Sequence, residues 1–206
     1  MYLNCHTYYS LRYGTIKPED LLAIAIKNNI QALALTDINN TSACLDFVRL
    51  STKYNIKPVL GVDFRNGVEQ QFILLAKNNS GFQNINNYLA FFLHHKNLKI
   101  PKQPAVIIDD CFVIYPYHKA KQYTLKPNEF LGIKPEDLNT LKFSKWNTKR
   151  HKLVILQTVS FQNKKGFNTH RLLRAIDNNT LLSKLSKSEE GSEKDVFLSE
   201  ENLKNI

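Results

Sequence analysis

The sequence predicts an α/β fold in which strands and helices alternate around a closed or nearly closed barrel. Short apolar runs recur along the chain, about seven in all, and most are followed by a segment with helical periodicity. A chain of 206 residues, 43% hydrophobic and 22% charged, is also large enough to bury the core of such a barrel. These observations exclude wholesale disorder and fibrous repeats.

The first third of the chain has the clearest alternation. Its expected elements are a strand at 1–5, a helix from Pro18, a strand at 32–35, a helix near 41–54 and a strand at 58–64. Proline suits the first turn of a helix, and Glu19 and Asp20 follow it where acidic side chains complement the helix dipole. The order β-α-β-α-β indicates a parallel sheet with right-handed crossovers.

The alternation continues less regularly to about residue 182. Strands are expected at 72–76, 111–115, 130–133 and 153–159, and helices at 80–93, 135–141 and 169–178. We assign residues 1–182 to one domain. Residues 183–206 are expected to form an exposed linker and the start of a further element, because their composition turns to Ser, Lys and Glu. Ser199 is a suitable N-cap for a helix within which the sequence stops, as in a truncated chain.

Composition also bears on the compartment. No apolar run approaches the roughly 20 residues that span a bilayer, and the first residues lack the features of a signal peptide. The three cysteines include no Cys-x-x-Cys pair. We therefore expect a reducing, cytoplasmic setting and no membrane partner.

Positive charge is concentrated in one part of the chain. The net charge is +10, and residues 138–176 contain nine Lys or Arg residues and no Asp or Glu. Such a segment indicates contact with a polyanion such as DNA, although a solvated lysine-rich face is an equally good explanation. The candidate nucleic-acid-binding residues are Lys142, Lys145, Lys149 and Arg150. Tryptophans anchor a core more often than they stack on a base, so Trp146, the single tryptophan, is expected to be a core residue.

Polar side chains that could bind a metal follow several of the expected strands. They are His6, Asp37, Asp63 and His118. In a β/α barrel the carboxyl ends of the strands meet at one rim, where imidazole and carboxylate groups could hold Zn²⁺ or Mn²⁺ for phosphoester hydrolysis. The alternative is that His6 and Asp37 only satisfy local turns.

Several stretches of the chain resemble the PHP (polymerase and histidinol phosphatase) domain of bacterial DNA polymerase III alpha subunits. They are residues 4–11 (NCHTYYSL), 32–37 (ALALTD), 56–64 (IKPVLGVDF), 74–82 (LLAKNNSGF) and 169–176 (THRLLRAI). The resemblance covers nearly the whole chain and is weakest between about 94 and 129. It implies a PHP-type distorted (β/α)7 barrel.

The metal-binding motifs of that family are incomplete here. Asn4 stands in the place of the first histidine of a His-x-His motif, Ile38 in that of a histidine after Asp37, and Gln71 in that of another histidine. Thr158 and Ser160 replace an Asp-x-His motif, and Asp63 replaces a glutamate. Ligand-type side chains therefore remain only at His6, Asp37, Asp63 and His118, and a cluster of several ions needs its full ligand set. We expect no cofactor, or at most one weakly bound Zn, Mn or Mg ion.

The resemblance implies a structural domain of a replicative DNA polymerase, with the nucleotidyl-transfer site in sequence not present here. The expected partners are the remainder of the polymerase alpha subunit, the proofreading exonuclease subunit and DNA. A metal-dependent PHP phosphoesterase or 3'-5' exonuclease is the alternative. A nucleic-acid-binding module that uses the basic segment is a third hypothesis.

Overall fold

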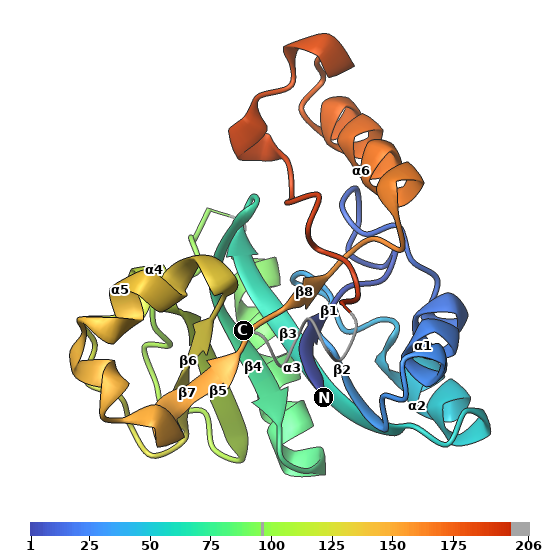
Figure 1. The fold of residues 1–206 in the computed structure, drawn as a ribbon. Helices are drawn as coiled ribbons and strands as arrows, with labels where there is room; N and C mark the ends of the chain where they lie inside the picture. Colours follow the sequence, from blue (N-terminus) through green and yellow to red (C-terminus); the bar gives the residue numbers. More distant parts are fainter. Residues whose placement is uncertain (96, 199–206) are drawn as a thin grey trace.

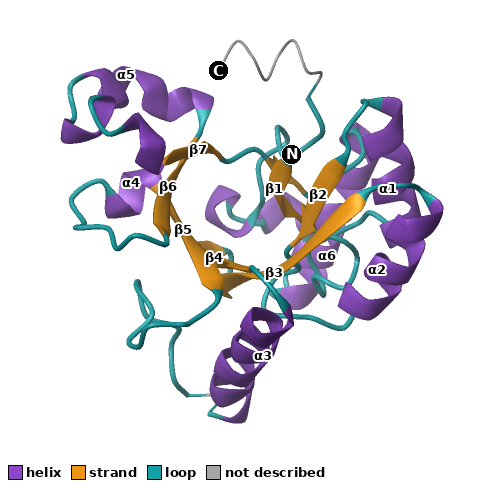
Figure 2. Ribbon diagram, turned by 90° about the horizontal axis from the view of Figure 1, so that it is seen from below, coloured by secondary structure: helices purple, strands orange, loops and turns teal. Residues whose placement is uncertain are grey.

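The computed structural model describes residues 1–95 and 97–198. Its strands form one eight-stranded sheet in the order β7-β6-β5-β4-β3-β2-β1-β8. The sheet curls into a ring, and α1, α2 and α3 lie on the outside of it (Figure 2). The predicted class, an α/β fold built on a distorted barrel, is therefore confirmed.

The first third of the chain folds in the predicted order. Its elements are β1 (Tyr2–Cys5), α1 (Pro18–Lys27), β2 (Ala32–Leu35), α2 (Cys44–Lys53) and β3 (Lys57–Asn66). The three strands are parallel neighbours. Leu22 of α1 and Phe47 of α2 pack with Leu33 in one buried cluster, so the helices cover the outer face of these strands.

A hairpin interrupts the βα pattern. No helix separates β3 from β4 (Glu69–Ala76), and β4 runs antiparallel to both β3 and β5 (Cys111–Pro116). The chain turns at Asn66-Gly67, where Gly67 adopts a φ of 61° that glycine tolerates without strain. Asn-Gly between two strands is a strong hairpin signal that the sequence interpretation overlooked.

The second half completes the ring. It contains α3 (Asn79–His94), α4 (Tyr117–Ala120), β6 (Glu129–Ile133), α5 (Leu138–Lys142), β7 (Leu153–Ile155), β8 (Thr158–Val159) and α6 (Lys164–Asp177). The start predicted for the last helix, residue 169, is wrong, because the side chain of Asn163 caps the helix by accepting a hydrogen bond from the N–H of Gly166. No described helix is long and apolar enough to cross a membrane.

One short segment brings the two edges of the sheet together. The strand predicted at 153–159 is divided into β7, which pairs with β6, and β8, which pairs with β1. Only Leu156 and Gln157 separate these two strands. Because β7 and β8 are the first and last strands of the sheet, the backbone passes from one edge of the sheet to the other within two residues. The divided strand therefore explains why the barrel is distorted.

The interior of the barrel differs along its length. Ala34, Ile73, Leu75, Ile114 and Leu156 form a buried apolar cluster between the strands. Toward the other end, Asn4 on β1, Asp63 on β3 and His6, directly after β1, are fully buried polar residues. The barrel thus has one apolar end and one polar end.

The segment after α6 is only partly exposed. Residues 183–189 are mostly exposed, as expected for a linker. Residues 190–198, here termed the strap, return to the barrel, where the carbonyl of Asp195 accepts hydrogen bonds from the N–H groups of Ser160 and Phe161 at 2.9 and 3.1 Å. Uniform exposure is therefore wrong for the strap, and the helix predicted from Ser199 lies outside the described residues.

Candidate functional site

The polar end of the barrel collects side chains from three strands. Asn4 lies on β1, where the pairing register shifts between Tyr2 and Cys5 and lets both Leu3 and Asn4 contribute to the interior. The amide nitrogen of Asn4 donates to the hydroxyl of Thr158 on β8 at 3.0 Å. This bond ties together the two strands near the rim.

The imidazole of His6 is fully engaged by neighbouring side chains. Its Nδ1 lies 2.8 Å from the hydroxyl of Ser160, and its Nε2 lies 3.0 Å from Oδ2 of Asp63 and 3.1 Å from Oδ1 of Asn4. The residue is fully buried. Both ring nitrogens therefore have protein partners, and the imidazole offers no lone pair to a metal without breaking one of these contacts.

Asp63 is paired with an arginine that the sequence interpretation did not single out. Arg65 lies two residues along β3, on the same face of the strand, and its Nε and Nη2 donate to Oδ2 of Asp63 at 2.9 and 2.7 Å. The side chain of Arg65 is only 6% exposed. Its guanidinium also lies 4.9 Å from the ring centre of Tyr13, which adds a cation–π contact.

The electrostatics of this pair follow from burial and proximity. Burial alone would raise the pKa of Asp63, but the charge of Arg65 and the contact with His6 together lower it to about 2. Burial would lower the pKa of Arg65, whereas the Asp63 carboxylate raises it. Both groups are therefore charged at neutral pH, and each compensates the buried charge of the other.

Asp37 organises a loop next to this pair. Its Oδ1 accepts hydrogen bonds from the N–H of Thr7 at 2.6 Å and the hydroxyl of Ser10 at 2.7 Å, and its Oδ2 accepts one from the hydroxyl of Thr7 at 2.8 Å. Burial raises the pKa of this carboxyl, and these hydrogen bonds oppose the shift. Both carboxylate oxygens of Asp37 thus have protein partners, which come from a loop 27 and 30 residues earlier in the chain and not from the turn that contains Asp37.

His118 does not join the other candidate ligands. It lies on α4, exposed at the surface, and no hydrogen bond connects it with His6, Asp37 or Asp63 in the described residues. Partial burial lowers the pKa of His118. The sequence-based assignment of His118 rested on the stretch where the family resemblance is weakest.

The residues at this end do not fit a cluster of metal ions. The described part of the chain contains no group of three or more His, Cys, Asp or Glu side chains that could hold an ion. A positively charged guanidinium already contacts the carboxylate that would be the main ligand. One feature remains unexplained, since Oδ1 of Asp63 is buried and has no hydrogen-bond partner among the described residues.

The strap covers the polar end. Asp195 is buried there, and burial raises the pKa of its carboxyl, with Lys134 and Arg65 opposing the shift. His170 of α6 anchors the start of the strap, because its Nε2 accepts a hydrogen bond from the N–H of Gly191 at 2.8 Å. Its Nδ1 then donates to the carbonyl of Tyr13, also at 2.8 Å, which fixes a neutral imidazole.

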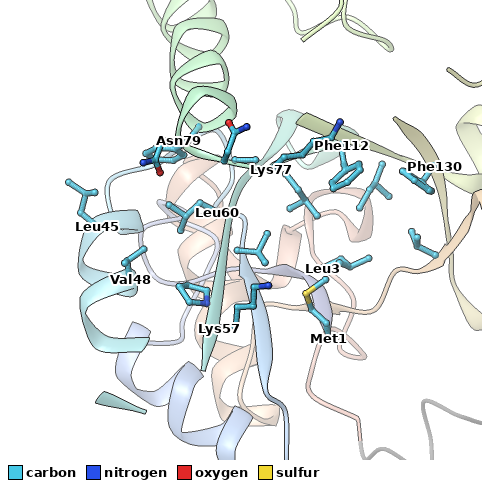
Figure 3. A pocket seen from close by; sticks show the side chains of 18 residues that line it. Met1, Leu3, Leu45, Val48, Lys57, Leu60, Lys77, Asn79, Phe112 and Phe130 are labelled. Atoms are coloured by element: carbon cyan, nitrogen blue, oxygen red, sulfur yellow. The ribbon is translucent and has the colours of Figure 1, made fainter. Parts of the chain in front are cut away.

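The opposite end of the barrel is an apolar opening (Figure 3). Its volume is about 860 Å³, and it lies where β1 and β3 begin. Lys57 and Lys77 are its charged lining residues, and the Lys77 ammonium lies 4.7 Å from the ring centre of Phe112. The apolar lining includes Met1, Leu3, Leu45, Val48, Phe112 and Phe130.

The four candidate nucleic-acid-binding residues lie on and after α5, between β6 and β7. Lys142, Lys145, Lys149 and Arg150 are all exposed. Trp146 is 3% exposed, and its indole N–H donates to the carbonyl of Lys121 at 2.6 Å. It is a core residue and offers no surface for stacking.

Comparison with known proteins agrees with the resemblance seen in the motifs. The family model described as "PHP domain" matches residues 3–127. The DNA polymerase III alpha subunit of Ureaplasma parvum is 24% identical over 186 residues, which cover 88% of this chain and 18% of the relative. The corresponding subunit of Buchnera aphidicola (subspecies Schizaphis graminum) is 24% identical over 239 residues, covering 98% of this chain and 20% of the relative.

The match covers only a small part of each of these relatives. The chain spans about a fifth of the length of the curated relatives it matches. Among solved structures, a metal-dependent phosphoesterase candidate from Bifidobacterium adolescentis aligns over 99% of this chain and 94% of its own. The identity is 11% and the TM-score 0.39, a similarity too low to support an inference.

Proposed function

We propose that this chain, which belongs to the PHP domain family, serves as a structural domain of a DNA polymerase III alpha subunit. In this role it hydrolyses no phosphoester. We assign residues 1–182 to the domain and regard His6, Asp37 and Asp63 as remnants of the family's metal site. The observation that carries the proposal is the buried ion pair between Asp63 and Arg65.

The ion pair opposes metal binding for an electrostatic reason. A divalent ion at Asp63 would lie next to a guanidinium that is buried and already bonded to the same oxygen. Two like charges repel strongly at such short range where water is excluded. Metal binding would therefore require Arg65 to leave, and its departure would also break the contact with Tyr13.

The apolar opening supports a scaffolding role. Monomeric proteins rarely expose continuous apolar surfaces of this kind, and larger ones mark contacts with other macromolecules. Since the relatives are about five times longer, the remainder of the alpha subunit is the partner that we propose. Docking of the proofreading exonuclease subunit stays a prediction.

One observation favours the alternative, a metal-dependent phosphoesterase or 3'-5' exonuclease. The unpartnered Oδ1 of Asp63 is an oxygen ligand that could accept a single cation. A single ion held by one oxygen would be weakly bound, in line with the expectation of at most one Zn, Mn or Mg ion.

Metal binding and nuclease assays test the proposal directly. Protein purified without chelator should contain well under one equivalent of Zn or Mn, and its Tm should not respond to Mn²⁺, Zn²⁺ or EDTA. Exonuclease and phosphatase assays should show no turnover that a His6→Ala variant abolishes. Two or more bound equivalents, with turnover lost in His6→Ala and Asp37→Ala, would instead establish the alternative.

A restoration series separates loss of ligands from blockade by Arg65. The triple variant Asn4→His, Ile38→His, Ser160→His returns family ligands but keeps the guanidinium, so we expect it to bind metal poorly. Adding Arg65→Gln should allow binding, seen as a Tm increase with Mn²⁺ that EDTA reverses. Equal binding by the two variants would show that Arg65 does not block the site.

A further inference from the structure

The chain between β6 and β7 forms a small basic lobe beside the barrel (Figure 1). It contains α5 and three short 3-10 helices, Pro135–Asp137, Lys145–Asn147 and Arg150–Lys152, and its two acidic residues lie in the first of these. Residues 138–152 include five Lys or Arg residues and no Asp or Glu. The scaffold role proposed above makes no use of this lobe.

A groove of about 580 Å³ opens on the lobe. Its polar lining consists of Asn139, Lys142, Asn147 and Arg150, over an apolar floor that includes Leu141 and Leu153. No carboxylate lines it, and neither cation forms an ion pair within the described ranges. Two cations and two side-chain amides around one groove are suited to phosphate oxygens.

An exposed aromatic ring lies next to a groove residue in the sequence, although it does not line the groove itself. Phe143 follows Lys142 directly at the end of α5 and is 93% exposed, the highest value among the large apolar residues of the described chain. Packing therefore does not explain why a phenyl group occupies this position. Trp146, by contrast, is buried in the same lobe and has a hydrogen-bond partner.

The lysines of the lobe divide into two groups. The Lys145 ammonium donates to the carbonyls of Gln122 and Tyr123 at 3.4 and 3.2 Å and lies 5.1 Å from the ring centre of Trp146. Lys149 lies 5.9 Å from the same ring. Both lysines are therefore partly committed to the structure of the lobe. Lys142 and Arg150 line the groove; Arg150 also donates through its Nε to the carbonyl of Asn147 at 3.4 Å, and its other guanidinium N–H groups have no protein partner among the described residues.

We propose that this surface, defined by Asn139, Lys142, Phe143, Asn147 and Arg150, binds single-stranded nucleic acid. Lys142 and Arg150 contact phosphates along the groove, and the exposed ring of Phe143 stacks on an unpaired base. Charged grooves with an aromatic platform are typical of proteins that bind single strands with little sequence preference. A duplex has no free base face for Phe143, so single strands are the favoured ligand.

Fluorescence anisotropy with the 206-residue chain tests the proposal. The probes are a labelled oligo-dT strand and a blunt-ended, two-strand duplex with the same number of phosphates, each titrated across a salt series. We expect the single strand to bind with a Kd on the order of 10⁻⁴ to 10⁻⁶ M and more tightly than the duplex. Phe143→Ala should weaken single-strand binding by roughly 10-fold and leave the salt dependence unchanged.

Charge substitutions provide the second readout. Lys142→Gln and Arg150→Gln should each reduce the slope of log K against log salt by about 0.7 for the single strand. Matched controls are Phe91→Ala, a half-exposed phenylalanine on α3, and Lys53→Gln, an exposed lysine at the end of α2; both should bind like wild type. Circular dichroism verifies that each variant is folded.

Three results would overturn the proposal. They are no binding of oligo-dT by the wild type at 50 mM salt, equal binding by Phe143→Ala and wild type, or a duplex affinity equal to that for the single strand. The last result would indicate a purely electrostatic contact, without stacking.

Discussion

The two ends of the barrel use the same strands in opposite ways. At the polar end, Asp63 of β3 is buried, charged and paired with Arg65. At the other end of the same strand, Lys57, Pro58 and Val59 line an apolar opening that no described segment fills (Figure 3). The end that carries the candidate metal ligands is thus closed by contacts within the protein, whereas the apolar end still has surface to bury.

This comparison indicates where each end derives its stability. The charges at the polar end are compensated within the chain. Removing one member of the ion pair therefore leaves the other charge buried without a counter-charge, which destabilises the folded state. The apolar end has half-exposed side chains such as Phe112. Folding buries little of their apolar surface and so stabilises the protein little through them, whereas a partner that covers them would bury the rest. Substitutions should therefore act on folding at the first end and on association at the second.

The largest expected effect is loss of the ion pair. Asp63→Asn keeps the shape of the side chain but leaves the Arg65 guanidinium buried without a counter-charge, which should cost about 3–5 kcal/mol of unfolding free energy. The double variant Asp63→Asn, Arg65→Gln should regain a large part of that loss. Urea denaturation of the wild type, both single variants and the double variant measures this coupling. A loss below ~1 kcal/mol in Asp63→Asn would contradict a closed, internally compensated end.

A second expected effect concerns the cover of the polar end and its dependence on pH. Burial lowers the pKa of His170 to about 4 from its usual 6.5, because the folded chain needs a neutral imidazole between Tyr13 and Gly191. Below pH 6.5 the unfolded chain takes up a proton at this position and the folded chain does not. Stability from His170 is therefore complete above pH 6.5 and is lost as the pH falls toward 4.

Equilibrium unfolding as a function of pH measures this effect. The wild type should lose stability between pH 6.5 and 4, and His170→Gln, which keeps a donor and an acceptor but cannot titrate, should be less stable at pH 7 and flatter over that range. His95, exposed on the other side of the barrel, provides the control variant His95→Gln. An unchanged pH profile in His170→Gln would show that other groups cause the acid sensitivity.

Substitution at the apolar end should have the smallest effect on folding. Phe112 is 39% exposed, so Phe112→Ser should change the unfolding free energy by no more than ~1 kcal/mol. The same change should reduce binding of a hydrophobic dye and any self-association seen by light scattering. Phe91→Ser, on the outside of α3, controls for loss of an exposed phenylalanine elsewhere. Equal dye binding by wild type and Phe112→Ser would mean that the opening is not an accessible apolar surface.

The sequence predicted much of the fold and less of the site. The first three strands and α1 were predictable because their apolar pattern matches their burial. In α2 the match is partial, since Phe47 is buried but Leu45 and Val48 are exposed. The hairpin at Gly67 carried a recognisable Asn-Gly signal, but the expectation of continued βα units obscured it. The bounds of α6 depend on a cap at Asn163 that lies upstream of the apolar residues.

The site was harder because its key contact depends on the tertiary structure. Asp63 was identified from its place after a strand, yet nothing in the chain marks Arg65 as buried, since most arginines are exposed. The spacing of the two residues by two on one strand was the available clue. Asp195 lies in a stretch of polar composition, and only its contacts with Ser160 and Phe161 place it over the barrel.

The junction between β1 and the strap has a mechanical consequence. The phenol of Tyr2 donates to the carbonyl of Leu198 at 2.8 Å and accepts from its N–H at 3.0 Å, and Phe197 packs against the same ring with centroids 4.9 Å apart. Tension applied to the chain at Leu198 is therefore delivered to the first strand, and α6 is shielded from it. A pull on the chain at Leu198 would therefore load β1, the strand next to the β8 edge of the sheet, and the two hydrogen bonds at Tyr2 would have to break before that force could reach the rest of the strap.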